Sequence, residues 1–526
     1  MKIRTRYRKI LMAAFFALLL EAKPENVLAM SEPSVHIRQW RISSQNFVPD
    51  QKAQALLETV TNRDLTMEQM KNVAEQLTKQ LQNQGYPVAR AYLPEQVVQD
   101  GVATITIAPG FYGEIVIRNH TGIATSVLRT QLGNVRSGAL IRVRDLERAL
   151  LLLGDLGGLE AHGTLMPGKE SGKADLLIVV NSKTKNMNGS IGVNNHGNRF
   201  TGIWGSELGL SLENPAQHGD VLSIHGTYFG SDMSSGGASY QIPFGGSGKL
   251  TAQHSRLYYE LGQDFASLDA NGKAEVSELS YQYPLSRSRN QNLYVQIGYA
   301  VKLLEDRVDS TSTVNNKQSN MMKIGIAGNS VDGKGVTAYS AMFSTGSLQI
   351  NSQAAQLQDA VTTRSSGQFS KWDVSLTRQH QIDKNRQVYL SFNGQMANKN
   401  LDSSEKIFLG GANGVRAYPS GEAAGDDGYI FTAELRQLIS SSQDRNQTLQ
   451  VVGFIDYGST VLNHNTWPGG PSPNQRNLSG VGIGLIWKRS RDFSFRLDYA
   501  WKLGAEEAVS DTDRNGRLWI EATKYF

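Results

Sequence analysis

Apolar and polar side chains alternate through the last ten residues of the chain, which end on an aromatic residue. Alternation with a period of two is the pattern of a strand with one apolar face and one polar face. The two faces that it predicts carry Leu518, Ile520, Ala522 and Phe526 on one side, and Arg517, Trp519, Glu521, Thr523 and Tyr525 on the other. A terminal strand of this kind is typical of transmembrane β-barrels, so the pattern indicates a protein of the bacterial outer membrane.

The same alternation recurs from Thr184 to the end of the chain, in runs separated by polar, glycine-rich connections. The clearest run is Phe493–Trp501, where aromatic and aliphatic residues alternate with Ser494, Arg496, Asp498 and Ala500. The pattern predicts an antiparallel β-barrel of about 16 strands over residues 184–526. The expected strands begin near Met187, Gly202, Asp220, Gly237, Leu250, Lys273, Asn292, Asn320, Tyr339, Phe369, Arg386, Gly428, Thr448, Ser479, Asp492 and Arg517.

Connections of two lengths alternate along this region. Short turns opposite long surface loops are typical of bacterial barrels, in which the short turns face the periplasm. An even number of strands would leave the C-terminus and the region before the barrel together on that side. The tight links are expected at Asn214–Gly219, Gly245–Lys249, Ser286–Gln291, Asp383–Asn385 and Arg489–Arg491.

Residues 1–29 have the pattern of a secretory signal peptide. Basic residues between Lys2 and Lys9 precede the apolar run Ile10–Leu20, and we expect cleavage after Ala29. An apolar run of this length is too short to cross about 30 Å of hydrocarbon as a helix, so a membrane anchor is not expected. Only a few residues separate Ala29 from the first expected strand at Val35, and we therefore expect no plug helix.

Composition narrows the possible functions. The 526 residues include 52 glycines and 19 tyrosines, and only 39% are hydrophobic, which suits a barrel with a wet interior. The chain has no cysteine, so thiolate catalysis and cysteine metal sites are excluded. A net charge of +5 is small for this length, and no basic stripe interleaves with aromatic residues, so no nucleic-acid partner is expected. The nine histidines are scattered, and we expect no metal and no cofactor.

Residues 30–183 look like two copies of one small α+β unit, 30–110 and 111–183, with the order strand–helix–helix–strand–strand. In the first copy, Met70, Val73, Leu77 and Leu81 form an apolar stripe on the second helix. The expected elements of this copy are Val35–Ile42, Asp50–Val60, a helix that opens at Leu65 and Thr66, Pro87–Leu93 and Val102–Ala108. Those of the second copy are Glu114–Asn119, Ser126–Leu132, Arg142–Leu153, Ala161–Met166 and Ala174–Asn181.

The longest connection in the barrel region, approximately Asn400–Asp427, contains the glycine-rich segment Gly410–Pro419 with one arginine, Arg416. On the thirteenth expected strand, apolar residues and Gly453 take one face, so Phe454 and Asp456 fall on the lumen face. A lumen aspartate can accept a bidentate bond from an arginine that folds in from a loop. The sequence therefore predicts an ion pair inside the barrel.

These motifs resemble those of a known family. The Gly-Tyr, Ala-Arg and Leu-Pro-x-Gln spacing of residues 85–96 is similar to that of the polypeptide-transport-associated domain in the outer-membrane transporters of two-partner secretion, the haemolysin secretion and activation family. The loop motif and Phe-x-Asp-x-Gly resemble paired motifs of the superfamily that inserts or secretes proteins at the outer membrane. By this resemblance the pair is Arg416 and Asp456, and Val415, Tyr418, Phe454 and Gly458 shape the contact.

The resemblance also places client binding in the first periplasmic domain, at Tyr86, Arg90, Tyr92, Pro94 and Gln96. The sequence departs from the family pattern at two positions. Ala417 stands where glycine is usual, so a positive φ there would be strained. Lys524, third from the end, stands where barrel-assembly signals prefer an apolar or aromatic residue.

The resemblance implies a transporter without enzymatic activity, located in the outer membrane with its N-terminal domains in the periplasm. The expected client is an exoprotein whose N-terminal secretion domain is caught unfolded, by strand addition, and then passed through the barrel. Outer-membrane lipid and, during biogenesis, the barrel-assembly machinery are the other expected partners. A monomer is expected because a closed barrel leaves no open edge. The client could be a haemolysin, an adhesin, a contact-dependent toxin or a haem scavenger.

Three other functions compete with this interpretation. An assembly or insertion factor for outer-membrane proteins would share the loop motif, but its main members carry three or more periplasmic domains. A passive porin has no need for such domains, and an enzyme would need a motif such as Gly-x-Ser-x-Gly or His-Glu-x-x-His, which the sequence lacks. The pair of Arg416 and Asp456 could also be a structural ion pair that only keeps the loop folded.

Overall fold

The computed structural model describes residues 33–44, 47, 50–230, 232–442 and 446–526. The expected signal peptide, its cleavage after Ala29 and the expected absence of a plug helix fall outside these residues. Contacts divide the chain into two compact units, with the boundary between Gly110 and Phe111. Within the described ranges, no helix combines the length and the apolar character needed to cross a membrane.

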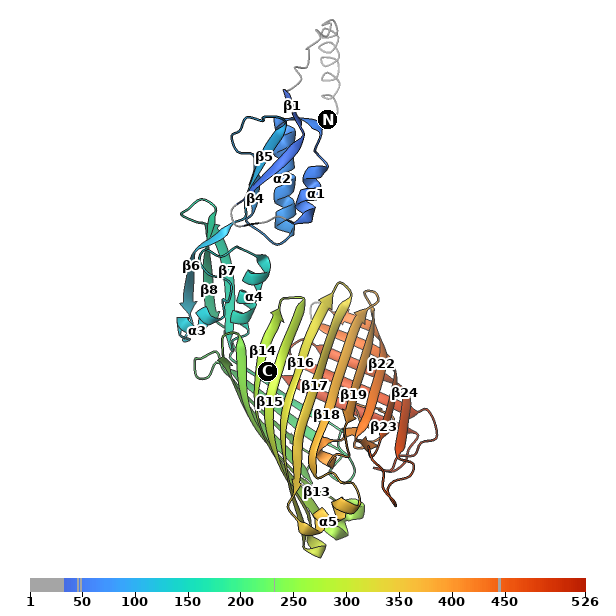
Figure 1. The fold of residues 1–526 in the computed structure, drawn as a ribbon. Coiled ribbons are helices and arrows are strands. Elements are labelled where there is room, and N and C mark those ends of the chain that lie inside the picture. Colours follow the sequence, from blue (N-terminus) through green and yellow to red (C-terminus); the bar gives the residue numbers. More distant parts are fainter. Residues whose placement is uncertain (1–32, 45–46, 48–49, 231, 443–445) are drawn as a thin grey trace, which may run out of the picture. The chain divides into compact units, whose positions relative to one another are not determined.

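The first unit is a small α+β domain (Figure 1). β5 is the central strand of its main sheet, with β2 parallel on one side and β4 antiparallel on the other, while β1 pairs with β3. The apolar stripe expected on the second helix is buried, with Met70, Val73, Leu77 and Leu81 at most 5% exposed. The elements are β1 Ser34–Ile37, β2 Gln39–Ser44, α1 Gln51–Glu58, β3 Arg63–Thr66, α2 Met67–Asn83, β4 Arg90–Tyr92 and β5 Val102–Ala108.

This domain differs from the sequence-based expectation at two points. The single strand expected at Val35–Ile42 is two strands, because the chain leaves its pairing with β3 before it pairs with β5. Leu65 belongs to β3 rather than to the helix, since pairing with Val35 extends the strand up to Thr66. Thr66 is the N-cap of α2: its hydroxyl accepts from the Gln69 N–H, and the Gln69 side chain accepts from the Thr66 N–H, as in a capping box.

The second unit begins with another α+β domain and continues into the barrel. Its elements are β6 Phe111–His120, α3 Thr125–Thr130, α4 Val143–Gly154, β7 Leu159–Pro167 and β8 Lys173–Ser182. The sheet order is β6-β8-β7, and β6 runs parallel to β8. Arg287 of the barrel donates two hydrogen bonds, at 2.7 and 2.8 Å, to the carboxylate of Asp155, the C-cap of α4. Lys249 donates to the carbonyl of the same aspartate at 2.8 Å, so bonds to one residue tie this domain to two barrel strands.

The described residues from Met187 onward form a closed antiparallel barrel of sixteen strands, as the sequence predicted (Figure 1). Each strand begins close to its expected position, and the largest shift is at β16, which begins at Thr313 instead of Asn320. The strands are β9 Met187–Asn194, β10 Gly205–Glu213, β11 Val221–Tyr228, β12 Met233–Phe244, β13 Gly248–Glu260, β14 Ala270–Arg287, β15 Gln291–Val308, β16 Thr313–Asp332, β17 Gly335–Ile350, β18 Gly367–Gln381, β19 Arg386–Ala397, β22 Asp427–Ser442, β23 Gln447–Val461, β24 Gln475–Arg489, β25 Phe493–Lys502 and β26 Gly516–Tyr525.

Four described helices lie in the loops on the side opposite the tight turns. They are the 3₁₀ helices Gln263–Leu268, Asp309–Thr311 and Ser403–Glu405, and α5 Gln353–Val361.

The two faces of the strands differ as alternation requires. On β25, Tyr499 and Trp501 are 38% and 41% exposed on the outer face, whereas Asp498 and Ala500 on the lumen face are 2% and 0% exposed. The barrel closes by pairing β26 with β9. At the end of this pairing, the backbone of Phe526 exchanges two hydrogen bonds of 3.0 Å with Gly189.

Replacing Gly189 with leucine is expected to impair closure, because the new side chain would occupy the volume of the Phe526 ring. Overpacking of this kind costs about 1–3 kcal/mol. We expect several-fold less heat-modifiable folded barrel on semi-native gels of outer membranes. Gly453→Leu is the matched control, since nothing lies within 4 Å of a Cβ added there. Equal amounts of folded barrel in the two variants would contradict the packing described here.

Candidate functional site

The long loop between β19 and β22 folds against the lumen face of the barrel. Leu409, Val415, Ala417 and Tyr418 are all 0% exposed. The short strands β20 Ile407–Phe408 and β21 Ala424–Gly425 pair with each other and bring together the two ends of the glycine-rich segment. Within it, the Val415 N–H donates to the Leu409 carbonyl at 2.7 Å. The loop therefore has a defined internal structure.

Arg416 is the centre of the contact between this loop and the barrel. Its Nε and Nη2 donate to the two carboxylate oxygens of Asp456 on β23, at 2.8 Å each, and its backbone N–H donates to the same carboxylate at 3.2 Å. Its Nη1 donates to Glu434 on β22 at 2.8 Å and to Asp498 on β25 at 3.0 Å. The arginine is 2% exposed, so carboxylates rather than water compensate its charge. The structure thus brings together the two residues that the sequence paired, while their role in transport stays a prediction.

Two more arginines balance the charge of the cluster. Arg436 contacts Glu434 at 2.6 Å, and Arg496 donates to Glu434 at 2.7 Å and to Asp498 at 2.8 Å. Three guanidinium groups therefore face three carboxylates. Removing one partner of a buried ion pair costs about 3–5 kcal/mol, because the other charge remains buried.

Aromatic side chains fix the position of the guanidinium and of the loop backbone. The Cζ atom of Arg416 lies 3.4 Å from the centroid of the Phe454 ring, which is a cation–π arrangement. Trp519 on the closing strand donates from its indole N–H to the Arg416 carbonyl at 2.7 Å. A Cβ added to Gly458 would lie 3.1 Å from a methyl group of Val415, so this glycine lets the loop approach β23 closely.

Ala417 fits this arrangement without a left-handed backbone. It is not among the residues with positive φ, so the strain that a departure from glycine could cause does not arise. Its methyl group packs against β24, where a Cβ added to Gly480 would lie only 2.6 Å away. The space for Ala417 is therefore made by the absence of a side chain on the facing strand.

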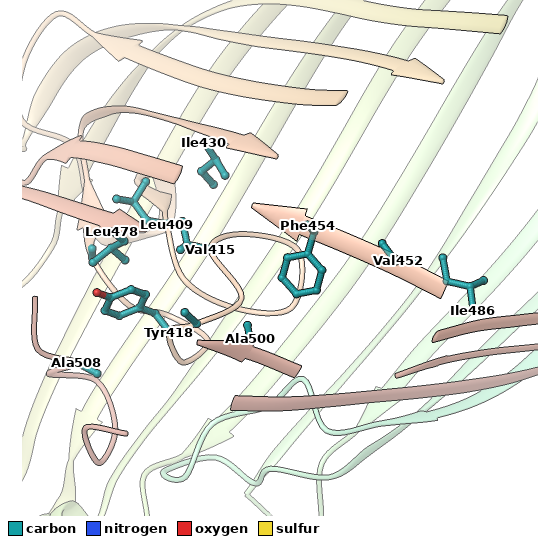
Figure 2. Packing of buried hydrophobic residues seen from close by; sticks show 12 residues of the cluster. Leu409, Val415, Tyr418, Ile430, Val452, Phe454, Leu478, Ile486, Ala500 and Ala508 are labelled. Atoms are coloured by element: carbon teal, nitrogen blue, oxygen red, sulfur yellow. The ribbon is translucent and has the colours of Figure 1, made fainter. Parts of the chain in front are cut away.

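An apolar cluster encloses the arginine end of the loop (Figure 2). Tyr418 contributes the largest loop side chain, and its hydroxyl donates to the Glu506 carbonyl at 3.1 Å in the last surface loop. Because apolar side chains pack around the pair of Arg416 and Asp456, these two charges are kept away from water. The buried members are Leu409, Val415, Ala417, Tyr418, Ala423, Ile430, Val452, Phe454, Leu478, Ile486, Ala500 and Ala508.

The start of the loop is held by a second set of ion pairs that the sequence did not predict. Lys302 on β15 contacts Glu405 at 2.5 Å, and Lys371 on β18 contacts the same carboxylate at 3.3 Å. Lys317 on β16 contacts Asp402 at 2.8 Å. Alternation could place the lysines on the lumen face, but nothing in the sequence indicates which acids they meet.

Glu422 forms a third contact that sequence reasoning missed. It is 0% exposed and accepts hydrogen bonds from the backbone N–H groups of Val509 and Ser510, at 3.0 and 2.8 Å. Arg476 contacts its other oxygen at 3.0 Å. The surface loop between β25 and β26 is therefore bonded directly to the lumen loop.

The five residues expected to bind a client do not form one patch. Tyr92, Pro94 and Gln96 line a groove of about 680 Å³ beside α2 in the first domain, whereas Tyr86 and Arg90 do not line it. Tyr86 packs edge-on against Phe47, with ring centroids 4.9 Å apart. The Gln96 side chain bonds to both the N–H and the carbonyl of Thr104, at 2.6 and 2.7 Å, and so extends the pairing of β5. Tyr92 is 50% exposed and free to contact a ligand.

The fold and the loop define a class: a sixteen-stranded outer-membrane barrel that holds an arginine-anchored loop in its lumen and follows small periplasmic domains. A family model for "Haemolysin secretion/activation protein ShlB/FhaC/HecB" matches residues 172–486, and one for "POTRA domain, ShlB-type" matches residues 35–110. The chain therefore belongs to the haemolysin secretion/activation family. It is an outer-membrane transporter of two-partner secretion, with its N-terminal domains in the periplasm.

Known relatives agree with this assignment. The heme/hemopexin transporter protein HuxB of Haemophilus influenzae (strain 86-028NP) is 26% identical over 498 residues, 92% of this chain and 85% of HuxB. The outer membrane transporter CdiB-2 of Burkholderia pseudomallei (strain 1026b) is 22% identical over 435 residues, 78% of this chain and 70% of that protein.

Solved structures with low sequence identity share the fold. CdiB from Escherichia coli has a TM-score of 0.75 at 18% identity, covering 96% of this chain and 93% of CdiB. BamA from Haemophilus ducreyi lacking POTRA domains 1–3 has a TM-score of 0.55 at 17% identity, covering 94% of this chain and 100% of the other.

Labelling of a buried cysteine tests the anchoring of the loop by Arg416. In this cysteine-free chain, a cysteine in place of Leu409, which is 0% exposed, should be protected from a membrane-impermeant maleimide. Adding Arg416→Ala is expected to raise the labelling rate by at least about tenfold, because it leaves a buried carboxylate unpaired. Arg256→Ala is the control, since the side chain of this arginine is 60% exposed and pairs with Glu275 outside the cluster. Equal labelling with both substitutions would contradict the anchoring role.

Proposed function

We propose that this transporter binds the N-terminal secretion domain of an unfolded exoprotein in the periplasm and passes the chain in extended form to the cell surface. The observation that carries the proposal is the loop anchored in the lumen by Arg416. A barrel of this size encloses a water-filled interior. A loop folded inside leaves only part of that interior to a client, which favours an extended chain over a folded domain.

In this proposal the pair of Arg416 and Asp456 keeps the loop against one side of the lumen. Val415, Tyr418, Phe454 and Gly458 shape the contact by packing around it. A loop released from Asp456 would occupy positions across the lumen and obstruct the passage. The ion pair thus stabilises the folded loop, and it also affects transport because the shape of the free passage depends on the position of the loop.

Client capture begins at the periplasmic domains. In the first domain, the groove beside α2 presents Tyr92 and Pro94 to a bound segment, while Gln96 positions the groove wall through its bonds to Thr104. In the second, β7 is a strand of nine residues at the edge of the described sheet, where it pairs with β8. The unpaired backbone groups of an edge strand can accept an extended peptide as an additional strand, with little demand on its sequence.

In this proposal each part of the chain has its own role in secretion. Residues 1–29 direct export, residues 30–110 and 111–183 capture the client, and residues 184–526 conduct it. We propose that the chain works as a monomer surrounded by outer-membrane lipid, is inserted by the barrel-assembly machinery, and needs no enzymatic step, cofactor or nucleic acid. Because the relative HuxB is named a heme/hemopexin transporter, a haem-binding exoprotein is the first client to test.

Export of the exoprotein encoded beside the transporter gene tests this function. Cells with the unmodified transporter should release it into the medium. Arg416→Ala and a deletion of residues 35–110 should each reduce release strongly, because the first frees the loop and the second removes the capture domain. Folded barrel at the surface is measured in parallel, and Arg256→Ala, which removes an exposed arginine outside the cluster, serves as the control for the substitution.

The same strains separate secretion from barrel assembly. If release of the exoprotein persists in all of them while other outer-membrane proteins decline, the chain acts as an assembly factor and the proposed function is wrong. If release fails and other outer-membrane proteins are unchanged, the secretion function holds.

A matched pair of surface substitutions tests the groove in the first domain. Tyr92→Ser removes an exposed aromatic side chain from the groove, and we expect it to weaken binding of the purified secretion domain several-fold in a titration. Val97→Ser is the control, since Val97 is 83% exposed but does not line the groove. A client that binds both variants equally would exclude the groove as the capture site.

A further inference from the structure

Four neighbouring strands, β10–β13, form one part of the lumen face of the barrel. Directly paired residues share one face of a sheet, and the outer face of these strands carries Leu208, Ile224 and Tyr240, which are 47%, 40% and 38% exposed. We call the lumen-facing positions the small-residue wall. They are Gly205, Glu207, Gly209, Ser211, Glu213, Val221, Ser223, His225, Thr227, Met233, Ser235, Gly237, Ser239, Gln241, Pro243, Lys249, Thr251, Gln253, Ser255, Leu257 and Tyr259.

Serine, threonine and glycine are the most frequent residues on this wall. Serine or threonine occupies seven of its 21 positions and glycine three. Glu207, Glu213 and Lys249 carry its permanent charges, and all three have partners. Asn194 donates to Glu207 at 2.7 Å, Lys183 donates to Glu213 at 3.0 Å, and Lys249 donates to the Asp155 carbonyl at 2.8 Å. The wall therefore offers few groups that would hold a passing chain in one position.

The lumen loop is fixed to other strands. Its start is paired with lysines on β15, β16 and β18, and its arginine end with carboxylates on β22, β23 and β25. In the described ranges, no hydrogen bond or ion pair joins residues 400–427 to β10–β13. Moving the loop away would break both sets of ion pairs together, and separating a buried pair leaves an uncompensated charge. The described ion pairs thus hold the loop to strands other than β10–β13, and one further hydrogen bond joins Ser420 to the His196 carbonyl between β9 and β10.

We infer that the exoprotein crosses the barrel along the small-residue wall, between this wall and a loop that stays in place. The inference rests on the proposed function and adds the path that the client takes. The occupant is one extended segment of unfolded polypeptide without a fixed sequence. Hydroxyl groups can bond briefly to any backbone, and because the charged groups of the wall have partners, they give no preference for oppositely charged client residues.

Cysteine cross-linking tests the path, because the transporter has no cysteine of its own. The exoprotein encoded beside the gene carries a single cysteine and is fused at its C-terminus to a tightly folding domain without cysteine. This folded domain stalls the exoprotein during export. Single cysteines replace Ser223 or Ser239 on the small-residue wall. Matched controls replace Ser340 on β17 or Ser375 on β18, which pair with each other and share the lumen face on the loop side.

We expect cross-links at positions 223 and 239 to exceed those at 340 and 375 several-fold. Equal yields, or higher yields at the control positions, would overturn the path while leaving secretion itself intact. Failure of the unmodified transporter to export the client would instead contradict the proposed function, and the path with it.

Immobilising the loop gives a second, independent test. Cysteines in place of Lys317 and Asp402, which contact each other at 2.8 Å, can be joined by a short bifunctional thiol reagent. If the loop stays in place during transport, cross-linking the two cysteines should leave the export rate equal to that of the same variant without the reagent. Export that stops on joining would show that the loop must leave, and the inference would be wrong.

Discussion

The structure of the site depends on one charge that cannot be neutralised. A guanidinium group keeps its proton at any physiological pH, so Arg416 can be buried only where carboxylates surround it. Asp456, Glu434 and Asp498 provide them from three strands of one barrel wall, and Arg436 and Arg496 balance the excess negative charge. The loop consequently has one favourable position, because no other place in the described lumen combines these groups.

Packing around the pair follows from that position. The loop that carries Arg416 to Asp456 lies close to β23 and β24: a Cβ added to Gly480 would lie 2.6 Å from the Ala417 methyl group, and one added to Gly458 would lie 3.1 Å from a Val415 methyl group. The indole of Trp519 then satisfies the carbonyl that the turn leaves unpaired. Glu422 extends the order outward, since its carboxylate bonds the surface loop at Val509 and Ser510. Contacts of the lumen loop thus continue from the ion pair of Arg416 and Asp456 to the surface loop between β25 and β26.

The sequence was most informative where a feature depends on local pattern. Alternation located the strands and placed Asp456 on the lumen face, because the side-chain period of a strand needs no knowledge of its neighbours. It could not reveal that Glu434 and Asp498 share Arg416, or that Lys317 meets Asp402, since those partners are brought together by the curvature of the barrel. Similarly, Gln96 matched a motif, but only the structure shows that its side chain is occupied by Thr104.

The uneven distribution of charge in the lumen suits the transport of long unfolded chains. A client of varied sequence presents both signs of charge and many apolar side chains as it passes, and an ionic wall would bind some segments and repel others. The ion pairs that hold the loop lie on one side of the lumen, where the protein's own groups compensate every charge. The opposite wall includes serines such as Ser223 and Ser239, and its charged residues Glu207, Glu213 and Lys249 have partners within the protein. The ion pairs that stabilise the loop are therefore kept apart from the remaining passage, which can accept client segments of different sequence.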